Sequence, residues 1–371
     1  MTERPAARPS DARPPAPRPP APRPSAPRPP APGPSAAAPE GDAPVLSVRG
    51  LTVRFLMPGG RRVAAVTDAH FDVAPGECLA LIGESGCGKS VLASALLGLL
   101  PGNARTTGTA HVGGLDLIGA DEHVLARTVR GRVIGLVPQS PAAHLTPVRT
   151  VRAHLQETVA ALTGVRGRAA VRDAAVAAAE RAAFPPDHLD RYPHQLSGGL
   201  AQRAATALAL VGDAPLLLAD EPTTGLDRDL VDRTVDELRR HVDHGGTGDG
   251  GDGPGRALLM ITHDLAAARR VADRIAVMYA GRIVELADAD AFFGERGPRH
   301  PYSRGLLDAL PERAFVPVPG LPPELGALPE GCAFAARCDR RTDACAVQPP
   351  LPRQGDPVAC HHPHVTEDAR A

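Results

Sequence analysis

The chain has 371 residues, a formal net charge of −1, and 3% aromatic residues with no tryptophan. Such a chain has no overall field that attracts nucleic acid or anionic lipid, and too few aromatic rings to stack bases. No apolar stretch reaches the roughly 20 residues that cross a bilayer, and no N-terminal segment resembles a secretory signal. We therefore expect a cytosolic protein in which clustered, reduced cysteines indicate metal binding.

The sequence of the first part of the chain predicts a disordered tail followed by a β-hairpin. Residues 1–43 repeat Ala-Pro-Arg-Pro units, which cannot form a packed core, so this segment is expected to be disordered. Between residues 45 and 73, strand-like runs flank Met57-Pro58-Gly59-Gly60, which is a hairpin signal.

The next segment fits the G-x-x-x-x-G-K-[ST] pattern of a phosphate-binding loop. It follows an apolar run at residues 78–82, expected to be a buried strand, and precedes an expected helix at residues 89–100. The glycines let backbone N–H groups wrap around phosphate oxygens at the positive end of the helix. Lys89 would compensate the β- and γ-phosphates, and Ser90 would offer a hydroxyl to Mg²⁺. The residues of the loop are Gly83, Glu84, Ser85, Gly86, Cys87, Gly88, Lys89 and Ser90.

A second apolar run, at residues 216–219, ends in Asp220 and Glu221. A buried parallel strand that delivers two carboxylates at its C-terminal end produces this pattern. Asp220 would hold Mg²⁺, directly or through water, and Glu221 would polarise the attacking water as general base. The alternative is a solvated acidic turn, which the phosphate loop upstream makes the weaker interpretation.

A Ser-Gly-Gly run indicates a second anion site. Ser197, Gly198 and Gly199 precede an expected helix at residues 200–211, and a helix N-terminus attracts anions. The alternative is a plain helix cap with a flexible glycine pair.

In this order, these segments resemble the ATP-binding cassette (ABC) ATPases. The resemblance implies that Gln139 senses the γ-phosphate and joins the Mg²⁺ site, and that His263, after the apolar run at 257–262, contacts the γ-phosphate. It also implies that the Ser-Gly-Gly run reaches ATP on a second cassette, and that the loop ending in Asp227 joins the two sites. Phe55 stands where the family keeps an aromatic residue that stacks on adenine, and a core phenylalanine is the alternative.

The implied fold is α/β, a P-loop NTPase cassette of the ABC type with a RecA-like core. The resemblance implies an antiparallel β-subdomain formed by residues 45–73 and 109–117. It also implies a helical subdomain at about residues 140–205, which includes an Ala-rich helical stretch at 153–183. We expect a disordered tail at 1–43, the ATPase domain at 44–298 with a surface insertion at 244–255, a C-terminal extension at 299–364, and a disordered end at 365–371.

The sequence changes character at His300-Pro301-Tyr302-Ser303 and becomes rich in proline. It then resembles the cysteine-containing C-terminal extension of oligopeptide/dipeptide importer ATPases, whose relatives also serve nickel uptake. Four thiolates can hold Zn²⁺ or an iron–sulfur cluster. The resemblance implies a [4Fe–4S] cluster, as in some members of the family, with Zn²⁺ or reduced structural thiols as alternatives. The four cysteines are Cys332, Cys338, Cys345 and Cys360.

The resemblance implies an ATP- and Mg²⁺-dependent subunit that energises import of di- or oligopeptides, or of a related solute, at the cytoplasmic face of the membrane. The implied partners are a second ABC ATPase, identical or different, two integral-membrane permease subunits and an extracytoplasmic solute-binding protein, with no nucleic acid. The alternatives are a nickel or metabolite importer, a soluble ABC ATPase and an exporter ATPase. A single phosphate loop without coiled-coil or zinc-hook insertions argues against the soluble class, and the extension argues against the exporter.

Overall fold

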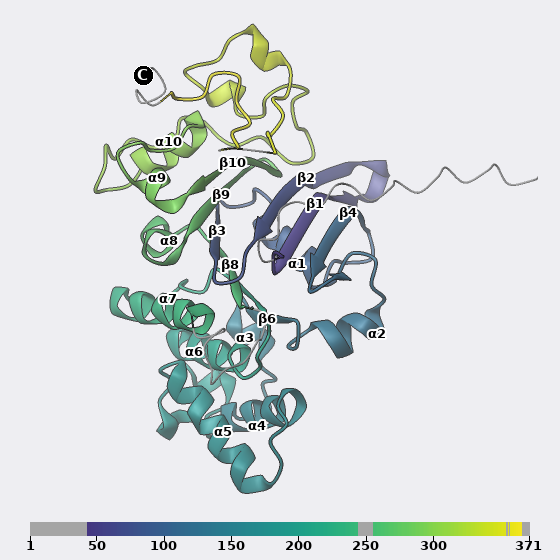
Figure 1. The fold of residues 1–371 in the computed structure, drawn as a ribbon, viewed down its shortest axis with the longest axis vertical. Helices are drawn as coiled ribbons and strands as arrows, with labels where there is room; N and C mark the ends of the chain where they lie inside the picture. The colour runs from purple at the N-terminus through teal and green to yellow at the C-terminus, as the bar shows by residue number, and fades with distance from the viewer. Residues whose placement is uncertain (1–42, 244–254, 354, 356, 366–371) are drawn as a thin grey trace, which may run out of the picture. The chain divides into compact units, whose positions relative to one another are not determined.

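The computed structural model describes residues 43–243, 255–353, 355 and 357–365. Most of three predicted segments lies outside the described residues, namely 1–42 of the tail predicted at 1–43, 244–254 of the insertion predicted at 244–255, and 366–371 of the end predicted at 365–371. Figure 1 shows the arrangement of the helices and strands. Across the described ranges, no helix is both long enough and apolar enough to cross a membrane.

A six-stranded sheet forms the centre of the described chain, with strand order β10-β9-β3-β8-β7-β6. The strands from β9 to β6 run parallel, and β10 pairs antiparallel with β9. Every residue of β3, β7 and β8 is buried, as expected for parallel strands covered on both faces. The three predicted apolar strands are therefore present. The bounds are β3 (Cys78–Ile82), β6 (Ile134–Val137), β7 (Leu216–Asp220), β8 (Ala257–Thr262), β9 (Arg274–Tyr279) and β10 (Arg282–Asp288).

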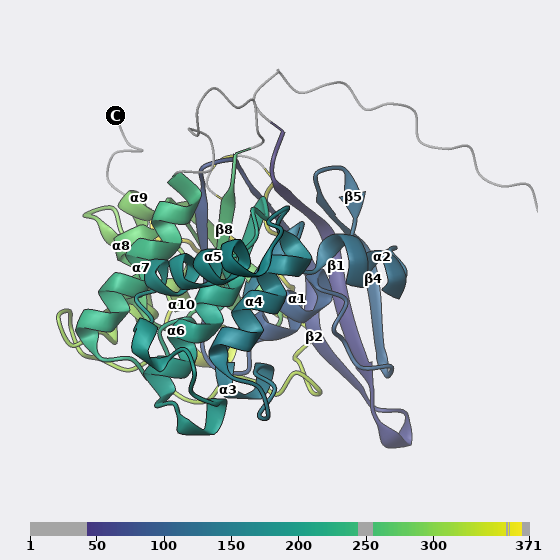
Figure 2. The ribbon, with the colours of Figure 1, turned by 90° about the horizontal axis from the view of Figure 1, so that it is seen from below.

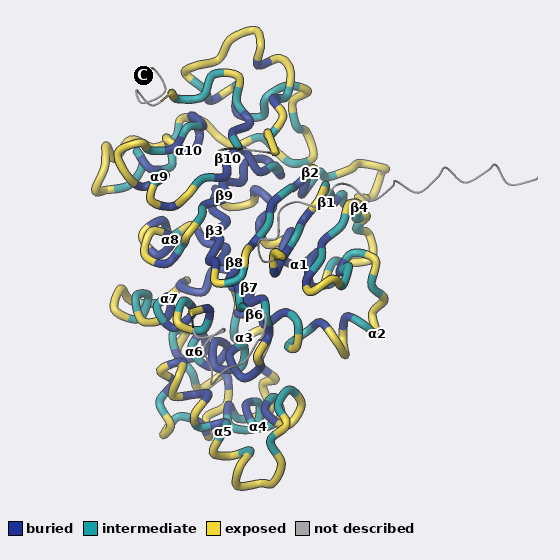
Figure 3. The backbone as a smooth tube through the Cα atoms, in the orientation of Figure 1, coloured by how far each residue is buried: buried dark blue, intermediate teal, exposed yellow. Residues whose placement is uncertain are grey.

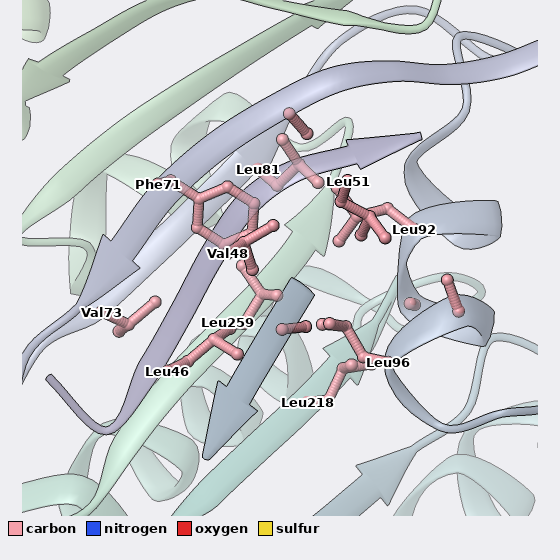
Figure 4. Close-up of a cluster of buried hydrophobic side chains, with 14 of the residues drawn as sticks. Leu46, Val48, Leu51, Phe71, Val73, Leu81, Leu92, Leu96, Leu218 and Leu259 are labelled. Atoms are coloured by element: carbon pink, nitrogen blue, oxygen red, sulfur yellow. The ribbon is translucent and has the colours of Figure 1, made fainter. Parts of the chain in front are cut away.

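Two hydrophobic cores cover the two faces of this sheet. Successive side chains along a strand point to opposite faces, so β3 contributes to both cores. Leu81 joins Leu92 and Leu96 of α1 (Lys89–Leu96) in the core drawn in Figure 4. Ile82 joins the other core, with α7 (Arg228–Asp243) and α8 (Leu265–Val271). Figure 3 shows buried residues along the strands and exposed residues in the outer loops.

An antiparallel sheet with strand order β2-β1-β4-β5 packs against the α1 side and confirms the predicted β-subdomain. Its first two strands form the predicted hairpin around Pro58–Gly60, and Figure 2 shows this sheet beside the helices. The helix expected at 89–100 ends at Leu96, because the chain reverses at Gly98, whose φ is 63°. The strands are β1 (Leu46–Leu56), β2 (Arg62–Val73), β4 (Ala104–Val112) and β5 (Leu115–Asp116), followed by the short α2 (Glu122–Val124) and the π-helical turn Leu125–Val129.

The helical part has a core of its own. The stretch expected to be helical at 153–183 forms two helices, because Gly164 and Gly167 interrupt it; Gly167 has φ 89°. The helices of this part are α3 (Pro141–His144), α4 (Val151–Leu162), α5 (Arg168–Arg181) and α6 (Gly198–Ala209), with short 3₁₀ turns at Pro186–His188 and Pro193–Gln195.

The C-terminal extension packs on the cassette and has little regular structure. The Leu286 N–H donates to the Pro357 carbonyl at 2.9 Å, and the Ala359 N–H donates to the Val284 carbonyl at 2.8 Å, so the chain end lies along β10. The residues described from 43 onward form one compact unit, so the predicted boundary at 298/299 stays a prediction. The elements are α9 (Ala289–Phe293), α10 (Pro301–Asp308) and the 3₁₀ turns Ala335–Arg337 and Asp343–Ala346.

Candidate nucleotide site

The register of the parallel sheet brings the predicted motifs to one edge. Ile82 lies opposite Thr262, Asp220 opposite Ile261, and Val137 opposite Ala219. The phosphate loop, Gln139, Glu221 and His263 come directly after these strand ends. Strand pairing alone therefore places four segments that are distant in sequence around one point, as expected for a parallel sheet that binds ligands at its carboxyl edge.

A cavity of about 430 Å³ opens at this edge. Four of the five sequence motifs contribute to its wall, namely the phosphate loop and the segments with Gln139, Glu221 and His263. The fifth, the Ser-Gly-Gly run, does not. Phe55, Asp220 and Asp227 are also absent from the lining. The lining residues are Ser85, Gly86, Gly88, Lys89, Ser90, Val91, Gln139, Glu221, Thr224, His263 and Leu325.

The ammonium group of Lys89 is buried at the base of the phosphate loop. Its Nζ donates to the carbonyls of Gly83 at 2.8 Å and of Glu84 at 3.0 Å. The loop needs glycine at position 88, where φ is 110° and a Cβ would lie 2.1 Å from the Ala65 carbonyl oxygen. Backbone carbonyls thus hold the cation beside the cavity, where phosphate oxygens can replace them. Lys89 is also the only lysine in the sequence.

Two of the predicted Mg²⁺ ligands are a serine of the cavity wall and a buried carboxyl that is hydrogen-bonded to it. The Ser90 hydroxyl donates to Oδ1 of Asp220 at 3.2 Å, and Gln139, the third predicted ligand, also lines the cavity. Burial raises the pKa of the Asp220 carboxyl above its ordinary value and Glu221 adds to the rise, while the Ser90 hydrogen bond opposes it. Hydroxyl, amide and carboxylate oxygens suit a hard cation such as Mg²⁺, so these residues fit the predicted ion.

Glu221 is held in a conformation that is unusual for a residue with a side chain. Its φ is 52°, in the left-handed region, which costs about 1–3 kcal/mol and is commonest at functional sites. Its N–H donates to the Ile261 carbonyl at 2.8 Å, which fixes this turn. Glu221 Oε2 lies 2.6 Å from Nδ1 of His263, whose side chain is 67% exposed, whereas that of Glu221 is 8% exposed. The pair can orient a water molecule and accept its proton.

The Ser-Gly-Gly run lies outside the cavity. The Ser197 hydroxyl accepts from the Leu200 N–H at 3.3 Å and caps α6, and both Ser197 and Gly198 are exposed. A Cβ on Gly199 would lie 3.3 Å from Leu226 Cδ2, so this run packs beside the loop that ends in Asp227. The helix N-terminus is therefore open to an anion from outside the chain, and its contact with a second cassette stays a prediction.

Some predicted residues contribute less directly. Phe55 is half-buried against the α1 core, and its adenine contact stays a prediction. Of the loop residues, Gly83, Glu84 and Cys87 do not line the cavity.

Leu325 of the extension lines the cavity although the sequence did not predict it, and its carbonyl accepts from the Ala64 N–H at 2.9 Å. Sequence reasoning missed Leu325 because it lies in a proline-rich loop without a motif.

The four cysteines of the extension are free thiols that line one small cavity with His300, His361 and His362. Burial raises the pKa of the thiols of Cys332, Cys338 and Cys360. In the part of the chain that the structure describes, no group of three or more His, Cys, Asp or Glu side chains is arranged to hold a metal ion. The fold thus brings four thiols to one cavity, but the described side chains are not arranged to coordinate a metal ion.

Two family models match the chain. One described as "ABC transporter" covers residues 66–224, and one described as "Oligopeptide/dipeptide transporter, C-terminal region" covers residues 284–345. The chain is also 37% identical over 317 residues to the oligopeptide transport ATP-binding protein OppD of Escherichia coli, with 83% of this chain and 89% of the relative covered. The chain belongs to the oligopeptide/dipeptide family of ABC transporter ATP-binding proteins.

OppD of Mycobacterium tuberculosis is 39% identical over 314 residues, which cover 82% of this chain and 49% of that protein. The chain thus spans about half the length of this mycobacterial relative. OppD of Haemophilus influenzae is 36% identical, with 83% and 93% covered.

The predicted cassette fold is confirmed by solved structures. The dimeric ATP-binding cassette MJ0796 bound to ADP and Pi has a TM-score of 0.57 at 24% identity, with 66% of this chain and 98% of that chain covered. The structure of cbiO1 from Clostridium perfringens has a TM-score of 0.55 at 24% identity, with 68% and 92% covered.

An acyl-phosphate derivative of ATP, which transfers its acyl group to an amine beside the phosphates, is expected to label Lys89. The reason is that the Lys89 ammonium lies where the cavity accepts phosphate charge. Peptide mass spectrometry locates the label, and the chain offers one lysine side chain to modify.

Excess ATP–Mg²⁺ should suppress this labelling by competition. A Lys89→Arg variant, which keeps the charge but lacks the amine, should lose the label. Labelling of Lys89 that excess ATP leaves unchanged would contradict a nucleotide site at this loop.

Proposed function

We propose that this chain binds and hydrolyses ATP and thereby energises an importer of di- or oligopeptides or a related solute. The observation that carries the proposal is the Glu221–His263 pair, which borders the same cavity as Lys89 and Ser90. The C-terminal match and the names of the relatives support the peptide class.

In this proposal the residues of the cavity have separate roles. Lys89 and the N–H groups of the loop bind the β- and γ-phosphates of ATP. Ser90, Gln139 and Asp220 hold Mg²⁺, which neutralises phosphate charge when bound. Glu221 accepts the proton of the attacking water, and His263 keeps its carboxylate in place and reaches toward the γ-phosphate. The left-handed turn at residue 221 aims this carboxylate into the cavity before substrate arrives.

The proposal includes a second cassette. Ser197 and Gly198 are exposed at the N-terminus of α6, and this end of the helix offers N–H groups that the chain's own cavity does not use. Two cassettes placed head to tail, identical or different, would each complete the site of the other. The further proposed partners are two integral-membrane permease subunits and an extracytoplasmic solute-binding protein, which would hold the chain at the cytoplasmic face of the membrane.

Replacing Glu221 with Gln is expected to lower the rate of ATP hydrolysis by about 10²–10⁴, because an amide cannot accept the proton of the attacking water. Affinity for ATP–Mg²⁺ should remain close to that of the wild type, since the phosphate-binding groups are unchanged. Phosphate release measures the rate, and calorimetry measures the affinity.

Glu312→Gln makes the same chemical change at an exposed residue of the extension and serves as the control. Hydrolysis by Glu221→Gln at the rate of this control would remove Glu221 from its proposed role.

We also propose that the four cysteines of the extension bind a metal centre, with an iron–sulfur cluster preferred over Zn²⁺. The support is that all four line one cavity and that thiolates are the donors both centres require. Because their arrangement is not a formed ligand set, binding would draw the thiols closer and remove their protons.

Protein purified without oxygen is expected to contain about four iron and four sulfide per chain, with thiolate-to-iron absorption bands, as a [4Fe–4S] centre requires. Cys338→Ser should lose this absorption, whereas Cys78→Ser, which alters a buried cysteine of β3, should keep it. Stoichiometric zinc would establish the structural metal instead. Anaerobic protein without metal would show that the cysteines are plain thiols.

A further inference from the structure

Glu84 joins the phosphate loop to the C-terminal extension. Its carboxylate oxygens accept from the two terminal nitrogens of Arg337, at 2.7 Å and 2.9 Å. Its N–H donates to the Tyr302 hydroxyl at 2.8 Å, and its carbonyl accepts from Lys89 Nζ at 3.0 Å. The side chain and the backbone of this one residue therefore connect the phosphate-binding lysine with two residues of the extension.

The extension and Tyr279 of β9 together hold Arg337 in place. Its Nε donates to the Pro319 carbonyl at 2.6 Å, and its guanidinium carbon lies 5.8 Å from the ring centroids of both Tyr279 and Phe334. The Arg337 side chain is 4% exposed, while that of Glu84 is 26% exposed. A fixed guanidinium fork binds a carboxylate through two directional hydrogen bonds. The more exposed Glu84 is thus held by the more buried Arg337.

Tyr302 is equally fixed. It is fully buried on α10, with its ring centroid 4.5 Å from that of Tyr279 and 5.5 Å from that of Phe334. Its hydroxyl accepts the N–H of the second residue of the phosphate loop, so the extension contacts the loop backbone as well as a side chain. Two independent contacts set the position of the Glu84 peptide units.

We propose that Arg337 and Tyr302 are positioning residues for the nucleotide site and that they act through Glu84. The inference rests on the proposed function, because it concerns affinity for ATP. Arg337 neutralises the Glu84 carboxylate of the phosphate loop, which would otherwise repel the triphosphate. Arg337 and Tyr302 together fix the carbonyl from which Lys89 moves to the phosphates. The C-terminal extension thus sets nucleotide affinity, although the phosphate loop lies some 250 residues earlier in the chain.

Calorimetry with ATP–Mg²⁺ tests this inference on the full-length chain. Arg337→Gln is expected to weaken binding about tenfold or more, because the loss leaves an unpaired carboxylate beside the phosphates. Adding Glu84→Gln to this variant should recover most of the affinity, since it removes that carboxylate. A purely structural role for Arg337 would not be relieved by the second change.

Arg313→Gln is the matched control, because Arg313 also lies in the extension but donates to the Phe293 carbonyl instead of the loop. It should bind ATP like the wild type. Tyr302→Phe removes one hydroxyl and keeps the buried ring, and we expect it to weaken ATP binding by roughly three- to tenfold. This second variant decides the question if Arg337→Gln does not fold.

The outcomes separate the positioning role from the function on which it rests. Wild-type protein that does not bind ATP would refute the proposed function. Wild-type protein that binds ATP, with Arg337→Gln or, failing that, Tyr302→Phe within twofold of it, would refute the positioning role. A double variant no better than Arg337→Gln alone would also refute it, because the effect would then not pass through the Glu84 charge.

Discussion

A buried ammonium group at the carboxyl edge of a parallel sheet is the constraint on which the site depends. Lys89 loses most of its hydration, and the carbonyls of Gly83 and Glu84 replace it at hydrogen-bond distance. This requires a tightly wrapped loop, which in turn requires glycine at position 88 against the Ala65 carbonyl. A cation held by two carbonyl dipoles and a long contact with the Cys87 sulfur can exchange them for phosphate oxygens. The same feature therefore accounts for the loop and for its proposed ligand.

The cassette and the C-terminal extension both contribute residues to the site. The parallel strands bring the phosphate loop, Glu221 and His263 together. The C-terminal extension adds Leu325 to the cavity wall and makes hydrogen bonds with Glu84. An extension that only covered the outer surface of the cassette would not place a buried arginine against the phosphate loop. The extension therefore contacts the candidate nucleotide site. The cysteine cavity borders the same segment that carries Arg337.

Local pattern and strand geometry made the central sheet and most of the cavity wall predictable from the sequence. Three apolar runs predicted β3, β7 and β8. Because parallel strands end at one edge of the sheet, the meeting of Lys89, Glu221 and His263 at one cavity was predictable as well. The pairing of Glu84 with Arg337 was not predictable, since neither residue type nor spacing marks a contact between such distant positions. The left-handed backbone of Glu221 was not predictable either, because it comes from the sharp turn after β7 and not from a preference of glutamate for this conformation.

Mixing two inactive variants tests the central claim that hydrolysis at the Lys89–Glu221 cavity is completed by the Ser-Gly-Gly run of another cassette. Ser197→Arg blocks the helix N-terminus, and Glu221→Gln disables the chain's own cavity. A mixed dimer retains one site with a normal Glu221 from one chain and a normal Ser197 from the other. If two cassettes complete each other's sites, each variant alone is inactive and mixing the two restores hydrolysis. Ser197→Arg protein that hydrolyses ATP like the wild type by itself, or a mixture as inactive as its components while the wild type turns over, would contradict it.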